Sequence, residues 1–345
     1  MSCCNKKTED KIKESESRGV ETTDSRHHKE TAMIQTVAVL NPWKAATLVV
    51  TTALIFTLAF GTLLATGVIQ IAGMSDATMA MKNMSGDEMK KDQTVLPSVM
   101  PVSVPLPITW GDIGTKMLAS GVIDEQKFTA LYESRGGVSD TIKTMLYDTN
   151  VGELTMTKEN AQDMLNLFWA FGVANKNPVL SEGPMVDEKY GGDPSRFAAT
   201  GGWNLRTGDI MDHYNNYAWV SLTPEQQSRV ETVSQGIFRP CCNNSTYFPD
   251  CNHGMAMLGL LELLAANDVS EDDMYDIALG VNTYWFPGTY ETIAAFTAEK
   301  GVDFADIPAK ELLGDGLSSA SGFAAVKSSL AGPAPTQQGG GGCSV

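Results

Sequence analysis

The chain has 345 residues, 43% of them hydrophobic, and its 25 Lys and Arg against 41 Asp and Glu give a formal net charge of −16. This length allows one large domain or two small ones with tails. A field this negative disfavours contact with nucleic-acid phosphates and anionic lipids, so we expect no nucleic-acid partner. It is compatible with a soluble domain that captures cations.

Residues 1–44 form the first segment, which is polar and has no periodic apolar positions. Its eight Lys and Arg nearly balance seven Asp and Glu. Segments of low hydrophobicity cannot bury enough apolar surface to fold, so we predict a disordered tail.

The next segment carries no charge at all over the 31 residues between Lys44 and Asp76. A helix needs about 20 apolar residues to cross the hydrocarbon core of a bilayer. We therefore predict one transmembrane helix within residues 45–72, spanning roughly Ala46 to Ile69. The run is longer than the apolar region of a cleaved signal peptide and follows a long polar tail, so we expect an uncleaved anchor.

The orientation of this helix follows from the basic residues on its two sides. The N-terminal flank carries more of them: Lys6, Lys7, Lys11, Lys13, Arg18, Arg26, Lys29 and Lys44. The near C-terminal flank has only Lys82, Lys90 and Lys91. Because positive loops stay in the cytoplasm, we predict a single-pass protein of the cell membrane with a cytoplasmic N-terminus and an extracytoplasmic C-terminal domain.

Residues 73–109 are predicted to be an extracytoplasmic linker with two halves. The first is rich in methionine: Met74, Met79, Met81, Met84 and Met89. Thioethers bind copper(I), although a flexible linker accounts for the composition equally well. The second half contains four prolines, at positions 97, 101, 105 and 107, and should form an extended, stiff spacer.

Residues 110–330 should form an all-α ectodomain of about eight to ten short helices. Thr223 with Pro224 and Ser270 with Asp273 have the pattern of helix starts, and Thr157 is a further candidate N-cap. No run shows the alternation expected of a strand. A long loop rich in Gly, Asp and Pro is expected at 181–212, and residues 331–345 should be a flexible Gly-rich tail carrying Cys343.

Chemistry concentrates in the fifteen residues from Arg239 to His253. Cys241, Cys242, Cys251 and His253 supply three thiols and an imidazole in the spacing Cys-Cys-x8-Cys-x-His. Thiolate and imidazole are good ligands for copper and zinc. The leading hypothesis is therefore a membrane-anchored protein that binds one of these metals as a carrier, sensor or redox centre.

Two alternatives use the same cysteines without a metal. A helix should start near Asn252, and a cysteine at a helix N-terminus has a lowered pKa, so Cys251 or Cys242 could be the nucleophile of a thiol-disulfide oxidoreductase. Outside the cytoplasm, cysteines also tend to pair, so Cys251 could bond to Cys241 or Cys242 and the remaining thiol to Cys343. That arrangement would be a disulfide-stapled, non-catalytic ectodomain for protein contacts.

Three further residues are candidate ligands. His213 follows Asp209 and Asp212 after the long loop, where it could bind the metal, act as a base or serve only in structure. Met255 and Met257 lie one turn beyond Cys251 and His253, although methionine in an apolar helix is usually core packing. The chain has no phosphate-binding, dinucleotide-binding or protease motif, so whether it is an enzyme, and which protein it contacts, are left open.

Overall fold

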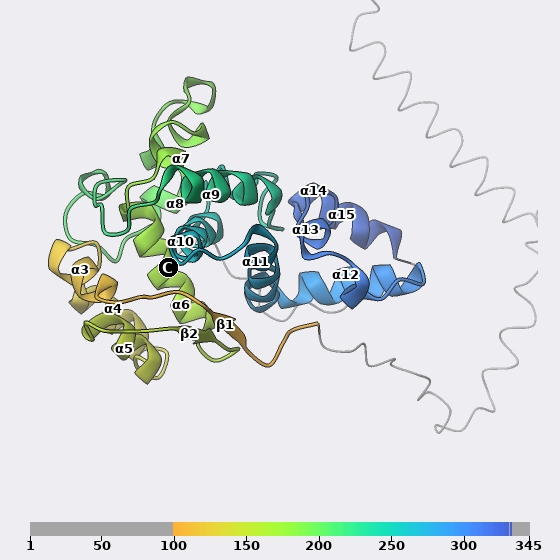
Figure 1. Ribbon diagram of the computed structural model, residues 1–345, viewed down its shortest axis with the longest axis horizontal. Coiled ribbons are helices and arrows are strands. Elements are labelled where there is room, and N and C mark those ends of the chain that lie inside the picture. The colour runs from red at the N-terminus through yellow and green to blue at the C-terminus, as the bar shows by residue number, and fades with distance from the viewer. Residues whose placement is uncertain (1–98, 331, 333–345) are drawn as a thin grey trace, which may run out of the picture. The chain divides into compact units, whose positions relative to one another are not determined.

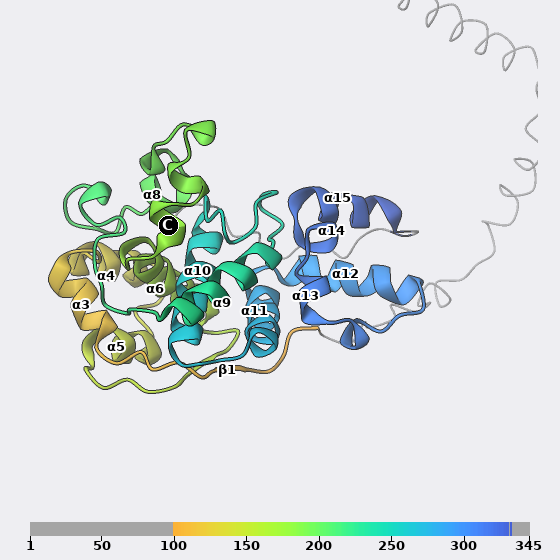
Figure 2. The same cartoon turned by 45° about the horizontal axis from the view of Figure 1, so that its top comes forward.

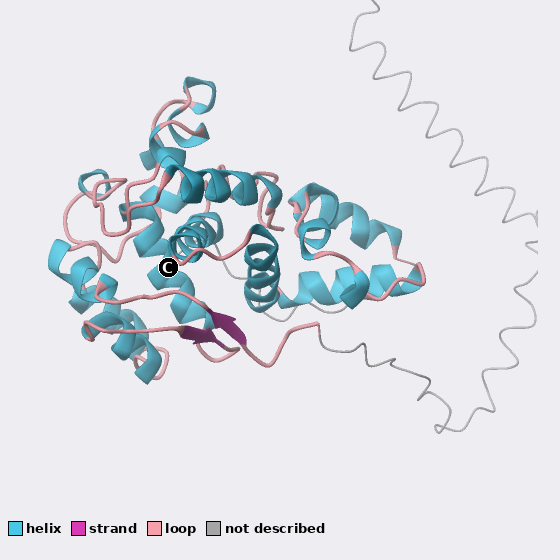
Figure 3. Cartoon of the chain, viewed as in Figure 1, coloured by secondary structure: helices cyan, strands magenta, loops and turns pink. Residues whose placement is uncertain are grey.

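The computed structural model describes residues 99–330 and Gly332 (Figure 1). Helices dominate this part of the chain, which confirms a mostly helical domain (Figure 3). The longer helices are α3 (Ile113–Ser120), α4 (Glu125–Glu133), α5 (Asp140–Tyr147), α6 (Ala161–Ala174), α9 (Pro224–Gly236), α10 (Asn252–Ala266), α11 (Glu271–Trp285), α12 (Pro287–Glu299) and α15 (Ala320–Ser329). The single-turn helices are α7 (Pro178–Ser181), α8 (Ala198–Gly201), α13 (Ala309–Leu312) and α14 (Asp315–Ser318). Short 3₁₀ turns are η1 (Pro184–Val186), η2 (Glu188–Tyr190), η3 (Pro194–Arg196), η4 (Ile210–Asp212) and η5 (Phe304–Asp306).

Helices α6 and α10 pack against each other at the centre of the domain (Figures 1 and 2). Nearly all residues of both are buried, which explains why neither has the polar stripe of a surface helix. Their backbones meet at two glycines. A Cβ on Gly259 would come within 2.7 Å of the Phe168 carbonyl oxygen, and a Cβ on Gly172 would overlap the Met255 carbonyl.

Some of the other helices pack directly on this pair, and helices α12 to α15 form a group beyond α11 (Figures 1 and 2). Helices α8, α9 and α11 all contact α10, and α11 also contacts α6. Helix α12 packs on α15, while α13 contacts α11 and α14 contacts α15. Helix α10 therefore contacts elements from widely separated parts of the sequence.

A small sheet departs from the all-α prediction. Strands β1 (Val104–Leu106) and β2 (Leu154–Met156) pair antiparallel, with Leu106 opposite Leu154. Each has only three residues, too few to show alternation in the sequence. Leu106 and Ile108 are fully buried, so the Pro-rich segment assigned to the linker adds its last residues to the domain core.

Several helix ends follow the sequence signals. Thr223 caps α9 in a complete capping box with Gln226, and Pro224 occupies the first turn. The Ser270 hydroxyl caps α11 by accepting the amide N–H of Asp273. The predicted cap at Thr157 is wrong, because α6 begins at Ala161 and its N-cap is Asn160. The Asn160 side chain accepts the Thr157 amide N–H.

The predicted tail, membrane helix and Met-rich segment lie in residues 1–98, outside the described residues. The Gly-rich tail that carries Cys343 also lies outside the described residues, except for Gly332. Within residues 99–330, no helix has the length and apolarity needed to cross a membrane.

A buried carboxyl on α10 ties the central helices to the following loop. Glu262 is fully buried, and its Oε2 accepts a 2.7 Å hydrogen bond from the Asn175 amide just after α6. The Asn175 side-chain oxygen in turn accepts the amide N–H groups of Trp219 and Val220. Burial raises the pKa of Glu262 to about 8, although the amides of Asn175 and Asn177 lower it, so the carboxyl is neutral at pH 7.

The protonated Glu262 should make stability depend on pH. Its pKa is about 8 in the fold and ordinarily 4.5, so the folded state binds the proton more tightly. The free energy of unfolding should therefore fall as pH rises between these values, by about 1.4 kcal/mol per unit of pKa difference. Urea unfolding at about pH 5 and pH 8 should show a smaller fall in Glu262→Gln than in the native chain. An equal fall in the free energy of unfolding for Glu262→Gln and the native chain would contradict this prediction. Glu153→Gln, which changes an exposed carboxyl, is the control and should behave like the native chain.

The contact between α6 and α10 predicts a second stability effect. Gly172→Ala places a methyl group against the Met255 carbonyl and should destabilise the fold by about 1–3 kcal/mol. In Gly316→Ala the new methyl meets no atom within 4 Å, so stability should be unchanged or slightly raised. Thermal unfolding compares the two variants, and equal midpoints would mean that the helices do not need the glycine.

Candidate metal centre

The candidate site lies in the loop from 237 to 251 between α9 and α10. Backbone hydrogen bonds tie this loop to distant elements. The Cys242 carbonyl accepts the Ala320 amide of α15 at 2.9 Å, and the Asp250 carbonyl accepts the Ala199 amide of α8 at 3.0 Å. Within the loop, the Thr246 amide donates to the Ile237 carbonyl at 2.8 Å. The cysteines are thus carried on a firmly held backbone.

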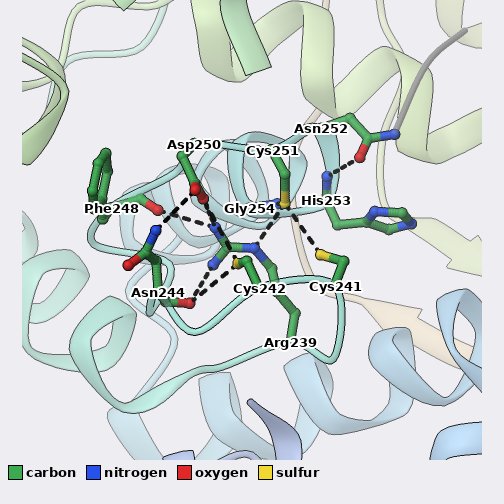
Figure 4. Close-up of polar contacts among 10 residues, drawn as sticks. All are labelled: Arg239, Cys241, Cys242, Asn244, Phe248, Asp250, Cys251, Asn252, His253 and Gly254. Carbon is green, nitrogen blue, oxygen red and sulfur yellow. Dashed lines mark hydrogen bonds and ion pairs between the residues drawn. The ribbon is translucent and has the colours of Figure 1, made fainter. Parts of the chain in front are cut away.

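Arg239 is the hub of the loop, and its side chain is only 2% exposed. Its Nε donates to the Cys251 sulfur at 2.9 Å, and its Nη1 donates to the Asn244 carbonyl at 2.9 Å. Its Nη2 donates to the Phe248 carbonyl at 3.0 Å and forms an ion pair with Asp250 at 2.7 Å (Figure 4). Burial lowers the pKa of the guanidinium, but nearby Cys251 and Asp250 raise it, so the group stays charged.

The start of α10 is adapted to this guanidinium. The helix begins at Asn252, as the sequence predicts, and the Cys251 sulfur caps it by accepting the Gly254 amide N–H at 3.4 Å. A Cβ on Gly254 would lie 2.5 Å from Cζ of Arg239. Glycine therefore lets the arginine fork lie directly against the first turn of the helix.

The surroundings of Cys251 favour the thiolate over the thiol. Its pKa lies well below the usual value, because the Cys241 and Cys242 thiols donate to it and the Arg239 charge acts in the same direction, against the effect of burial. Hydrogen bonds to Cys242 and Cys251, together with burial, raise the pKa of Cys241. The first proton to leave the cluster is therefore that of Cys251, the least exposed of the three cysteines.

The sequence-predicted ligands Cys241, Cys242, Cys251 and His253 do come together, and this cluster could hold a metal ion. It consists of two overlapping groups, each with its ligand atoms within 4.8 Å of one another. One is Cys241, Cys251 and His253, and the other is Cys242, Asp250 and Cys251. Cys251 belongs to both, with its sulfur 3.4 Å from that of Cys241.

His253 is buried in the first group with no hydrogen-bond partner on either ring nitrogen. Its ring lies against aromatic side chains at the end of α11. The centroid distances are 4.4 Å to Phe286 and 5.9 Å to Trp285. Phe286 and Trp285 thus form one wall of the imidazole site.

The three further candidates lie outside the two groups. Both ring nitrogens of His213 are occupied, Nδ1 by the Tyr217 hydroxyl at 2.9 Å and Nε2 by the Thr207 carbonyl at 2.8 Å. This arrangement fits the structural role considered for it. Met255 and Met257 are buried members of the hydrophobic core.

Sequence reasoning assigned Arg239 only a supporting effect and did not assign Asp250 or Asn244 to the site. The signal that could have identified Arg239 in the sequence was its basic side chain two positions before the paired cysteines. Asn244 also begins a glycosylation sequon, but its amide donates to Asp250 at 2.8 Å, so the side chain serves the loop.

Comparison with known proteins gave no further guide to this site. No family model, curated protein or solved structure matches the chain.

The contacts of Arg239 predict the effect of a conservative change. Arg239→Lys keeps the charge but loses the planar fork, so several buried acceptors lose their donors. The variant should lose about 2–4 kcal/mol of stability, and the pKa of Cys251 should rise. Urea unfolding and thiolate absorbance against pH, both on reduced, metal-free protein, measure the two effects.

The matched control is Arg229→Lys. Arg229 is partly buried and donates to the Val269 carbonyl at 2.9 Å, away from the cysteines. The Arg229→Lys variant should therefore leave the thiolate titration unchanged and lose little stability. If Arg239→Lys behaves like this control, the guanidinium does not organise the loop.

Proposed function

We propose that this protein binds one soft metal ion, copper(I) in preference to zinc, through Cys241, Cys251 and His253. The observation that carries the proposal is the unpartnered imidazole. His253 is 2% exposed, yet neither ring nitrogen has a hydrogen bond. A buried polar group without a partner is costly, and a metal ion in the group with Cys241 and Cys251 would supply the missing bond.

The second group of potential ligands already holds a cation. The Arg239 guanidinium lies between Cys251 and Asp250, bonded to both. The Cys242 sulfur turns to the same side, 3.7 Å from Asp250. A metal ion there would meet the fixed positive charge, so we assign the ion to the side of Cys241 and His253 and leave Cys242 out of the ligand set.

The number of ligands favours copper(I). Structural zinc sites are almost always four-coordinate, whereas copper(I) is satisfied by fewer ligands. Two thiolates and one imidazole are soft or borderline donors, which copper(I) accepts. Zinc would need a fourth ligand, either water or a further side chain, and the nearby Cys242 thiol is directed at Asp250.

Among the possible roles, we favour a carrier. Cys241 is exposed while Cys251 and His253 are buried, so one ligand of three can be reached by the thiolate of another molecule. Stepwise ligand exchange through that sulfur would allow the ion to be passed on. The uncharged run before Asp76 supports a carrier anchored in the cell membrane, with this domain outside the cytoplasm.

Metal transfer to the full-length, reduced protein tests the proposal. The native protein should take up copper(I) from a coloured chelator in the absence of oxygen. Each of the variants Cys251→Ser, Cys241→Ser and His253→Gln should take up one equivalent less. The loss of affinity should exceed the roughly 10–100-fold seen for outer-shell changes. Circular dichroism confirms that each variant is folded.

Cys242→Ser is the discriminating variant, because it removes a thiol from the same loop without removing a proposed ligand. It should keep the equivalent of copper that the other three variants lose. Equal loss in all four would show that Cys242 also binds the ion. Full retention in His253→Gln would refute the proposed site.

A further inference from the structure

Cys241 and Cys251 are placed for a reaction that needs no metal. Their sulfur atoms are 3.4 Å apart, although the residues are ten positions apart in the chain. The sulfur of the third thiol, Cys242, lies 3.7 Å from both the Asn244 carbonyl and Asp250, and within 4.8 Å of the Cys251 sulfur. A direct bond between the adjacent Cys241 and Cys242 would close a strained ring. The sulfur–sulfur contact of 3.4 Å therefore marks Cys241 and Cys251 as the pair placed to form a bond.

The two sulfurs also differ in access. Cys241 is exposed, whereas Cys251 is 5% exposed and held by two fixed donors, Nε of Arg239 and the amide of Gly254. Of these two residues, Cys241 is therefore the one that an incoming disulfide can reach. Cys251 lies behind it, with its sulfur held in place by the two donors.

We propose that Cys241 and Cys251 form a dithiol–disulfide couple that exchanges with small-molecule disulfides, with Cys241 as the entry thiol and Cys251 as the resolving thiol. The reaction belongs to the metal-free protein and does not depend on the proposed metal site. Its consequence for that site rests on the proposed function: the bond would remove two of three metal ligands, so oxidation and copper binding would exclude each other.

The chemistry balances in two steps. The Cys241 thiol passes its proton to the Cys251 sulfur, 3.4 Å away, and the Cys241 thiolate attacks one sulfur of the external disulfide, forming a mixed disulfide and releasing one small thiolate. Cys251 then loses that proton to solvent, and its thiolate attacks the Cys241 sulfur, closing the intramolecular bond and expelling the second small thiolate. Both released thiolates take up protons. The protein pair is oxidised by two electrons and the external disulfide is reduced to two thiols.

The test uses the reduced full-length chain with glutathione disulfide as oxidant, followed by alkylation and cleavage before aspartate. That cleavage places Cys241 and Cys242 on peptide 212–249 and Cys251 on peptide 250–267. The expected product is these two peptides joined, with fragment masses that place the bond at Cys241 and leave Cys242 alkylated. Unlinked peptides, or a bond at Cys242, would overturn the proposal.

Variants give a second, independent readout. Cys242→Ser should form the linked peptides at the native rate, and Cys241→Ser should form them much more slowly, because its remaining loop thiol faces Asp250. Equal rates in the two variants would contradict the assignment of Cys241. The fragment masses of the native chain decide the matter if a variant does not fold.

Copper separates this proposal from the proposed function. With copper(I) buffered at about a hundred times its dissociation constant, without oxygen, linking should slow about a hundredfold. Linking in the metal-free protein with no copper binding would refute the metal site and leave the couple standing. Copper binding without any linking would refute the couple and leave the metal site standing.

Discussion

The charge of Arg239 cannot lie inside the domain unless fixed acceptors surround it, and the structure of the cysteine loop follows from that requirement. A buried guanidinium without partners would cost many kilocalories per mole. Asp250 and the Cys251 thiolate neutralise it, and the carbonyls of Asn244 and Phe248 use its other donors. These contacts set the path of the backbone, the start of α10 and the charge state of one cysteine together.

Arg239 also separates the thiols onto two sides of the cluster. It occupies the side of the cluster with Asp250 and Cys242, and it leaves Cys241 and His253 on the other side of Cys251 (Figure 4). On the side of Cys241, the imidazole of His253 belongs to the first turn of the central helix α10 and packs against the aromatic residues at the end of α11. This side of the cluster is therefore rigid. Preorganised ligands on a packed helix lose little entropy when an ion binds.

Local signals in the sequence predicted much of the fold. The helix starts at Thr223, Ser270 and Asn252 depend on residues within one turn, so they could be predicted from the chain alone. The grouping of three cysteines with His253 followed from their spacing. The small sheet could not be predicted, because its two strands lie far apart in the sequence. The contacts of Arg239 could not be predicted either, because they depend on the path of an irregular loop that brings backbone carbonyls and a sulfur onto one guanidinium. The division of the ligands is likewise set by contacts of the loop with α8 and α15, which no local pattern records.

The central claim is that two sulfurs and one imidazole hold a soft ion beside a fixed guanidinium. X-ray absorption spectroscopy of the full-length protein loaded with one equivalent of copper(I) tests it most directly. Comparing native protein with Cys242→Ser isolates the signal of this site. We predict copper(I) with two sulfur neighbours and the multiple-scattering pattern of one imidazole, unchanged in Cys242→Ser. A site of sulfur alone, or a spectrum that loses a sulfur in Cys242→Ser, would contradict the account.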